Sequence, residues 1–345
     1  MDITELLNFA VKNQASDLHL SAGLPPMLRI DGEIQSINQA VLDQKTLQAL
    51  IEQITTEQQR REYQQQLEID FSFALADVAR FRVNLFNQNR GTAAVFRVIP
   101  SEVQSLTSLN APPFFASLCE KPRGLILVTG PTGSGKSTTL AAMIDQINCQ
   151  QSAHVLTIED PIEFVHHSQK SLINQREVHR DTQSFSQALR SALREDPDII
   201  LVGEMRDLDT IRLALTAAET GHLVFATLHT SSAAKSIDRI IDVFPAAEKD
   251  LIRAMLSESL QAVISQTLLK KVGGGRVAAH EIMLATPAIR NLIREGKVAQ
   301  MYSAIQTGRQ YGMQTLDQSL KSLLDQGLIE PATAFAKAVN PDSFG

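Results

Sequence analysis

The sequence has little cysteine, no long apolar run and no excess of basic residues, and each shortage excludes a class of protein. Cys119 and Cys149 are too few for a disulfide framework or a four-thiolate zinc site, so we expect two reduced thiols. The longest apolar runs, Leu125–Val128 and Ile199–Val202, are far shorter than the roughly 20 residues that span a bilayer. The acidic start, Met1–Glu5, has neither the basic stretch nor the apolar stretch of a signal peptide, which predicts a cytosolic protein.

The balance of charge limits the partners. The chain has 38 acidic and 32 basic residues, a formal net charge of −6, whereas nucleic-acid-binding proteins usually show a basic excess. We therefore expect no nucleic acid among the partners. The alternative, a DNA or RNA translocase, would require a local basic patch. The 43% share of hydrophobic residues is that of an ordinary globular protein and excludes a disordered chain.

A length of 345 residues favours two domains. Residues 1–100 predict a small α/β domain, and residues 101–113 predict a linker because they are rich in Ser, Thr, Asn and Pro. Residues 114–345 predict a second domain, in which short apolar strands alternate with helices as in βαβ units. From about residue 245 to residue 345 we expect mostly helix. The predicted fold class is α/β, with a parallel sheet covered on both faces.

The expected elements can be placed along the chain by their periodicity. In the first domain, Thr46–Gln66 reads as one polar helix, and Phe81, Val83 and Leu85 share the apolar face of a strand. The other strands expected with most support are Leu18–Leu20, Met27–Ile30, Asp70–Ala74, Ala93–Ile99, Gly124–Thr129, Val155–Ile158, Asp198–Val202 and Leu223–Thr227.

The strongest motif is a glycine-rich loop that fits G-x-x-x-x-G-K-[ST] between a strand and a helical run. Its glycines let successive backbone N–H groups turn inward around a phosphate, and the following helix adds its partial positive charge. We expect Lys136 to pair with the β- and γ-phosphates of ATP and Ser137 to bind Mg²⁺. The nucleotide-binding residues predicted are Gly130, Pro131, Thr132, Gly133, Ser134, Gly135, Lys136, Ser137 and Thr138.

A magnesium site also needs a carboxylate at the carboxyl end of a neighbouring strand. Glu204 follows the apolar run Asp198–Val202, with Gly203 between them, and is a better candidate than Asp198, because ligands bind beyond the carboxyl ends of the strands. The alternative for Glu204 is a salt bridge to Arg206.

Three further carboxylates, Glu159, Asp160 and Glu163, follow the strand Val155–Ile158. Like charges so crowded near a phosphate are costly unless a metal ion or arginine neutralises them, which favours a functional role. One or two of the three could instead only cap the next element.

Two histidines bracket the strand Leu223–Thr227. His229 follows its carboxyl end, where we expect it to sense the nucleotide, and His222, roughly 23 Å away along a straight strand, reads as a structural or interface residue. In the first domain Arg82 and Arg97 are candidates for arginine fingers, since guanidinium groups suit bidentate binding of phosphate. The alternative for both is an ion-paired arginine at the surface.

Beyond single motifs, the whole chain resembles the type II/IV secretion ATPase superfamily, and within it the type IV pilus retraction ATPases. The matching segments are Ala15–Leu20, the phosphate-binding loop, Thr157–Glu163 (the Asp box), Asp198–Asp207 (Walker B), Gly221–Thr230 (the His box) and Ala288–Glu295 (the retraction signature). Pattern alone makes the last segment an ordinary amphipathic helix after the N-cap Thr286 and the first-turn residue Pro287.

The resemblance implies a PAS-like N-terminal domain and a RecA-like ATPase domain, assembled as a homohexamer with ATP between the two domains. It implies that Glu163 is the catalytic glutamate, Glu204 the Walker B acid, and Arg82 and Arg97 the residues that sense phosphate. The ring would lie at the cytoplasmic base of the pilus machine on an inner-membrane platform protein, and would power pilus retraction and twitching motility.

Three rival functions stay open beside the translocase. Pilus-assembly and secretion ATPases of the superfamily have an extra N-terminal domain and a four-cysteine zinc module, and this chain has too few residues and cysteines for them. An accessory retraction ATPase, a paralogue that could also be a partner, shares the motif set. A regulatory nucleotide-binding ring with little turnover is disfavoured by the full set of carboxylates.

Overall fold

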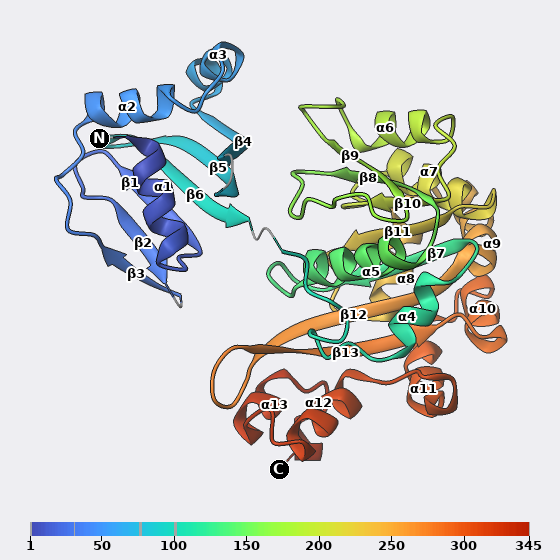
Figure 1. Ribbon diagram of the computed structural model, residues 1–345. Coiled ribbons are helices and arrows are strands. Elements are labelled where there is room, and N and C mark those ends of the chain that lie inside the picture. The colour runs from blue at the N-terminus through green and yellow to red at the C-terminus, as the bar shows by residue number, and fades with distance from the viewer. Residues whose placement is uncertain (1, 31, 76–77, 100–101, 345) are drawn as a thin grey trace. The chain divides into compact units, whose positions relative to one another are not determined.

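A computed structural model describes residues 2–30, 32–75, 78–99 and 102–344. The chain divides into two compact units, Met1–Glu102 and Val103–Gly345 (Figure 1). The first residue of the expected linker, Ser101, lies outside the described residues. Farther along that segment Leu106 is buried, in contact with the core of the second unit.

The first unit is an antiparallel sheet in the order β3-β2-β1-β6-β5-β4, with helices against one face. The apolar faces of α1 and α2 pack on Leu18, Phe81 and Val83, which are fully buried. The elements of this unit are α1 (Ile3–Lys12), β1 (Asp17–Ser21), β2 (Met27–Ile30), β3 (Glu33–Ser36), α2 (Gln44–Glu52), α3 (Glu57–Gln66), β4 (Glu68–Leu75), β5 (Ala79–Gln88) and β6 (Gly91–Ile99).

The prediction of one helix over Thr46–Gln66 is wrong, because the chain forms α2 and α3 with a break between them. Thr56 has an extended backbone and starts α3 as its N-cap. Its hydroxyl accepts from the N–H of Gln59, whose side chain accepts from the N–H of Thr56 in return. This capping box was readable in the sequence as Thr-x-x-Gln, and it satisfies N–H groups that a continuous helix would not expose.

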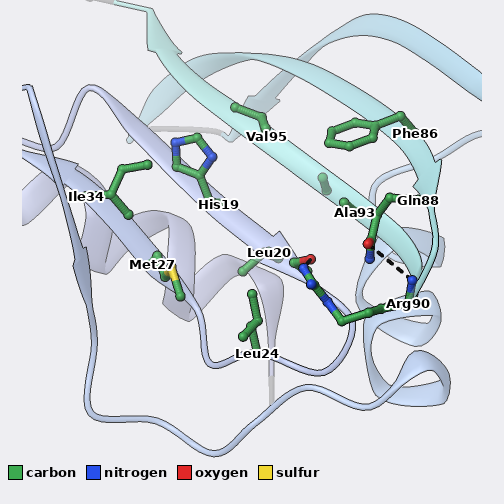
Figure 2. A pocket seen from close by; sticks show the side chains of 12 residues that line it. His19, Leu20, Leu24, Met27, Ile34, Phe86, Gln88, Arg90, Ala93 and Val95 are labelled. Atoms are coloured by element: carbon green, nitrogen blue, oxygen red, sulfur yellow. Dashed lines mark hydrogen bonds between the residues drawn. The ribbon is translucent and has the colours of Figure 1, made fainter.

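A pocket of about 260 Å³ lies on the sheet of the first unit (Figure 2). His19 stands between Ile34 and Val95 in this pocket, and Met27 and Phe86 also line it. Burial lowers the pKa of His19 and outweighs the opposing charge of Asp17, so the ring is neutral at neutral pH.

The second unit is built on a sheet in the order β13-β12-β7-β11-β10-β8-β9. Its strands pair in parallel, apart from the antiparallel pair of β12 and β13. The elements of this unit are α4 (Phe114–Cys119), β7 (Gly124–Thr129), α5 (Lys136–Gln150), β8 (His154–Glu159), β9 (Leu172–Glu177), α6 (Phe185–Ala192), β10 (Ile199–Val202), α7 (Leu208–Glu219), β11 (Leu223–Leu228), α8 (Ala233–Asp242), α9 (Lys249–Ser259), β12 (Leu260–Lys270), β13 (Arg276–Leu284), α10 (Pro287–Arg294), α11 (Met301–Thr307), α12 (Leu316–Asp325) and α13 (Pro331–Lys337).

Helices cover both faces of this sheet, which confirms the α/β class and explains the continuous apolar strands. Alternate residues of the central strands, such as Ile126 and Val128, pack against α4 and α5. Their neighbours Leu125 and Leu127 pack on the other face, against the helices α6 to α11 (Figure 1). No helix in the described part of the chain is both long and apolar enough to cross a membrane.

The segment 245–345 is only partly helical, and the prediction is wrong for β12 and β13. These strands are the long hairpin at the β13 edge of the sheet, joined at Gly273–Gly275, where all three glycines have positive φ. Burial on both faces removes the alternation of polar and apolar residues, and Leu, Ala, Gln and Met in these strands are good helix formers. The glycine run was the signal that marked the turn.

The retraction signature forms α10, and its two arginines have different surroundings. Ile289 and Ile293 are fully buried, as the amphipathic pattern predicts. The guanidinium of Arg290 donates to the carbonyls of Ser257, Glu258 (2.8 Å) and Leu260 (2.9 Å), so it caps the carboxyl end of α9.

We expect Arg290→Ala to lower the stability of the second unit by about 2–4 kcal/mol, because it leaves several helix-end carbonyls without their charged donor. Thermal unfolding of the purified protein checks this. Arg294→Ala on the same helix is the matched control: its exposed pair with Glu258 (2.9 Å) should contribute about 0–1 kcal/mol. Equal losses in both variants would contradict the capping role of Arg290.

Candidate active site

The candidate residues of the second unit meet at one edge of its sheet. The parallel strands β7, β8, β10 and β11 run in the same direction, with Thr129 beside Leu228 and Val202 beside Ile158. The segments that follow these strands therefore leave the sheet at its carboxyl edge, where α/β proteins bind ligands. They are the phosphate-binding loop, Asp160–Glu163, Gly203–Glu204 and His229.

Two glycines of the loop are required by close packing as well as by backbone conformation. Gly130 has φ 142°, and a Cβ there would lie 2.3 Å from the carbonyl oxygen of Gln266. Gly135 has φ 85° and precedes the first residue of α5, and its Cβ would lie 2.8 Å from the side-chain nitrogen of Gln266. A Cβ at Gly130 would therefore displace the backbone of β12, and one at Gly135 would displace the Gln266 side chain and strain the loop backbone.

The amine of Lys136 is held by carbonyl groups of the loop. Its Nζ donates to the carbonyls of Gly130 (2.9 Å) and Pro131 (3.1 Å). Burial lowers the pKa of Lys136, and the negative charges of Glu204 and Glu163 act against that shift. Both carboxylates are therefore close enough to Lys136 to interact with its charge.

The loop fits a nucleotide phosphate. Ser134 Oγ is buried and has no hydrogen-bond partner among the described residues, and the N-terminus of α5 faces the loop. Ser137 and Thr138, the first residues after Lys136, are half-buried.

Magnesium would find few protein ligands here. Among the described residues no three His, Cys, Asp or Glu side chains are grouped as a metal site. In NTPases phosphates and waters supply most ligands of Mg²⁺, and here the hydroxyl of Ser137 would supply one.

Glu204 lies at the centre of a polar cluster just beyond β10. One carboxylate oxygen accepts from Arg206 (2.6 Å) and the other lies 3.1 Å from Nε2 of His229. Burial alone would raise the pKa of Glu204, but Arg206 and His229 together outweigh it, so the pKa is lowered and the group is ionised. The Arg206 salt bridge considered from the sequence is therefore present, alongside a contact with the histidine expected to sense nucleotide.

The three carboxylates after β8 have separate surroundings. The carboxyl group of Glu159 is buried and accepts from Thr157 (2.6 Å) and Gln175 (3.2 Å), which anchors the segment. Asp160 is exposed, and its charge acts on Arg206. Glu163 is also exposed, and its charge acts on Lys136. Of the three carboxylates, Glu163 is thus the one whose charge acts on a residue of the loop.

The two histidines of the His box lie at opposite ends of β11. His229 follows the carboxyl end of the strand, and its Nε2 lies 3.1 Å from a carboxylate oxygen of Glu204. His222 precedes the strand, where its Nδ1 lies 3.0 Å from the carbonyl of Ala217 at the end of α7 and its own carbonyl accepts from Gly124.

The structure brings Arg82 and Arg97 of the first unit together. They are direct cross-strand partners on β5 and β6. Arg82 Nε donates to Asp70 (3.0 Å), and Arg97 Nε donates to Asp17 (2.9 Å), whose side chain is only 5% exposed. Both are therefore ion-paired, the alternative weighed from the sequence, and both keep their outer surface accessible: the Arg97 side chain is 64% exposed.

Sequence reasoning missed Gln266, which contacts the loop from β12. No motif points to it, and it lies in the segment that was expected to be helical. Gln175, the donor to Glu159 on β9, was missed for the same reason, because that strand was not predicted.

Comparison with known proteins places the chain in a family. The model of the type II/IV secretion system protein family matches residues 1–332. The chain belongs to this family. It is 68% identical over 344 residues to the type IV pilus retraction ATPase PilT of Pseudomonas aeruginosa, covering 100% of both chains. Identity to the type IV pilus ATPase PilU of the same organism is 38% over 343 residues, covering 99% of this chain and 90% of PilU.

A crystal structure of the pilus retraction motor PilT with bound ADP superposes with a TM-score of 0.93 at 49% identity, covering 99% of this chain and 98% of that one. Together with the loop, membership of the family makes this chain a P-loop enzyme that hydrolyses ATP. The resemblance drawn from its motifs is confirmed.

The buried carboxyl group of Glu159 predicts a pH effect on stability. Burial raises its pKa from 4.5 to about 7, against the hydrogen bonds from Thr157, Gln175 and the Glu163 backbone. The native state then binds more protons than the unfolded state between these values, so this group lowers stability as pH rises from about 4.5 to about 7. In Glu159→Gln the unfolding temperature should fall less over that range than in the wild type.

The control for this measurement is Glu219→Gln, an exposed carboxylate at the end of α7. It should retain the wild-type slope of unfolding temperature against pH. A wild-type slope in Glu159→Gln would contradict the assignment.

Proposed function

We propose that this chain is the Mg²⁺-dependent, homohexameric ATPase motor of type IV pilus retraction, and so of twitching motility. The observation that supports this most is the meeting of Lys136, Glu163, Glu204 and His229 at one sheet edge. The chain that holds them is 68% identical to PilT from end to end.

Each residue of the site has a role in this proposal. Lys136 and the backbone N–H groups of the loop hold the phosphates of ATP. Ser137 and Glu204 hold Mg²⁺, directly or through water, and the ion would neutralise charge on the phosphates. Glu163 orients the attacking water and accepts its proton. His229 reads the γ-phosphate through its contact with Glu204.

Arg82 and Arg97 are proposed as the residues of the first unit that read the same phosphate. Their ion pairs to Asp70 and Asp17 hold the guanidinium groups in place and leave part of each exposed. Loss of the γ-phosphate would remove the ligand of both arginines and so release the conformation in which they bind the nucleotide. The motion so produced would act on an inner-membrane platform protein at the cytoplasmic base of the pilus.

Two alternatives within the family are weaker. An accessory retraction ATPase like PilU is disfavoured by 38% identity against 68%, although such a paralogue remains a proposed partner. A pilus-assembly or secretion ATPase is disfavoured by the two cysteines, which cannot form a four-cysteine zinc module. A net charge of −6 gives no reason to propose a nucleic-acid substrate.

Glu163→Gln should lower kcat for ATP at least about 100-fold, because the amide cannot accept the proton of water, while ADP affinity stays within about threefold. Steady-state phosphate release and calorimetric ADP titration measure the two quantities. Glu219→Gln, the same change at an exposed site, should retain wild-type activity. Hydrolysis at the wild-type rate in Glu163→Gln would remove Glu163 from the catalytic role.

The direction of force is tested in cells that lack the protein. Electron-microscopic counts of surface pili together with a twitching assay should show abundant pili on non-motile cells, because extension continues while retraction is lost. Bald, non-motile cells would assign the chain to assembly. Cells that still twitch would assign it the accessory role.

A further inference from the structure

Gln266 contacts the phosphate-binding loop at several points, although it lies 132 residues after Ser134 in the chain. It is 3% exposed, on β12 next to β7. Its Nε2 donates to the carbonyl of Ser134 at 2.7 Å. Its backbone and side chain occupy the space that a Cβ would need at Gly130 and Gly135, at 2.3 and 2.8 Å. The conformation of the loop therefore depends on close packing and a hydrogen bond with this one residue.

The other end of the same side chain is also fixed. Its Oε1 accepts from Thr139 Oγ1 (2.8 Å) on α5 and lies 3.2 Å from Nε2 of His280 on β13. Burial lowers the pKa of His280 to about 4, so its ring is neutral and donates through Nε2. Since the Ser134 carbonyl can only accept, the amide has one orientation that satisfies all three neighbours.

This contact sets the direction of a backbone N–H group. The carbonyl of Ser134 and the N–H of Gly135 belong to one trans peptide, so they point in opposite directions. A bond that holds the Ser134 oxygen toward β12 turns the Gly135 N–H away from β12. Glycine-rich backbone is otherwise free to rotate this peptide, at the entropic cost that any ligand would then have to offset.

We propose that Gln266 is a positioning residue for nucleotide binding, which orients the Ser134–Gly135 peptide so that the loop presents its N–H groups to phosphate. This rests on the proposed function of the loop. Thr139 and His280 hold the Gln266 amide in turn, and His280 is itself fixed to α12 because its backbone N–H donates to Ser319 Oγ (3.1 Å). The support for the loop thus extends through β13 to the C-terminal helices.

The first test is Gln266→Leu, which keeps the size of the side chain and removes its hydrogen bonds. The Kd for ADP, measured by calorimetry on the full chain, should rise about tenfold or more, as expected when a buried carbonyl loses its donor. The kcat at saturating ATP should change less than the Kd, because Glu163 is untouched. A Kd within twofold of the wild type would overturn the proposal.

The matched control is Gln261→Leu on the same strand. Gln261 Nε2 donates to the carbonyl of Arg123 (3.1 Å) and packs on Gly124, so it repeats the arrangement at the opposite end of β7, away from the loop. Its ADP affinity should stay within twofold of the wild type. An equal loss of affinity in both variants would show a general effect of β12 and overturn the proposal.

Gln266→Glu separates the effect of the hydrogen bond to Ser134 from the effect of side-chain packing. It also tests the positioning role of Gln266 if Gln266→Leu fails to fold. A protonated carboxyl group can donate to Ser134 O as the amide does, whereas an ionised one repels it. Of the titratable groups nearby, the neutral ring of His280 is in hydrogen-bond contact with residue 266, and Lys136 lies in the phosphate-binding loop. The ratio of its Kd for ADP to that of the wild type should stay within about threefold near pH 5.5 and exceed about tenfold near pH 8.5.

A ratio that does not vary with pH would overturn the positioning role. Wild-type protein that neither binds ADP nor hydrolyses ATP would instead overturn the proposed function itself, so the two failures are distinguishable.

Discussion

The structure of the second unit depends on burial of a parallel sheet on both faces. Every residue of strands such as β7 and β10 is buried, and charged side chains are excluded from these strands. The charged groups of the site lie in the segments beyond the strand ends, and parallel direction brings those segments to one edge. Lys136, Glu163, Glu204 and His229 meet for this reason, although almost a hundred residues separate the first from the last.

Charge then organises that edge. The amine of Lys136 is partly desolvated and donates to neutral carbonyls. Two carboxylates on neighbouring segments interact with its charge. Glu204 is kept ionised by Arg206 and His229. Glu159, a few residues from Glu163, is instead held by neutral donors and favours its protonated form. The pKa values of Glu159 and Glu204 are thus shifted in opposite directions because their surroundings differ.

The sequence alone was sufficient to predict those residues whose role depends on a local sequence motif. Gly130 and Gly135, the Lys136 that follows them, and the acids after apolar strands could be found because strand, loop and helix are consecutive. Gln266 could not be found, since its role arises from pairing β12 with β7, and burial on both faces hid that strand. Helices α2 and α3 were merged because the whole polar segment Thr46–Gln66 favours helix and the Thr56 capping signal within it was not used. The surroundings of Glu159 could not be predicted either, because Gln175 lies on β9, and that strand has no strong alternation of polar and apolar residues.

The ion pairs of Asp17 with Arg97 and Arg29 in the first unit limit which substitutions this protein can accept during evolution. Asp17 on β1 stands between Arg97, its cross-strand partner on β6, and Arg29 on β2, at 2.9 and 3.8 Å. Asp17 is almost fully buried, so loss of Arg97 removes a phosphate-reading candidate and also leaves a buried carboxylate short of positive charge. A lineage that gives up Arg97 would therefore have to replace Asp17 as well, and the two positions should covary among relatives as a pair.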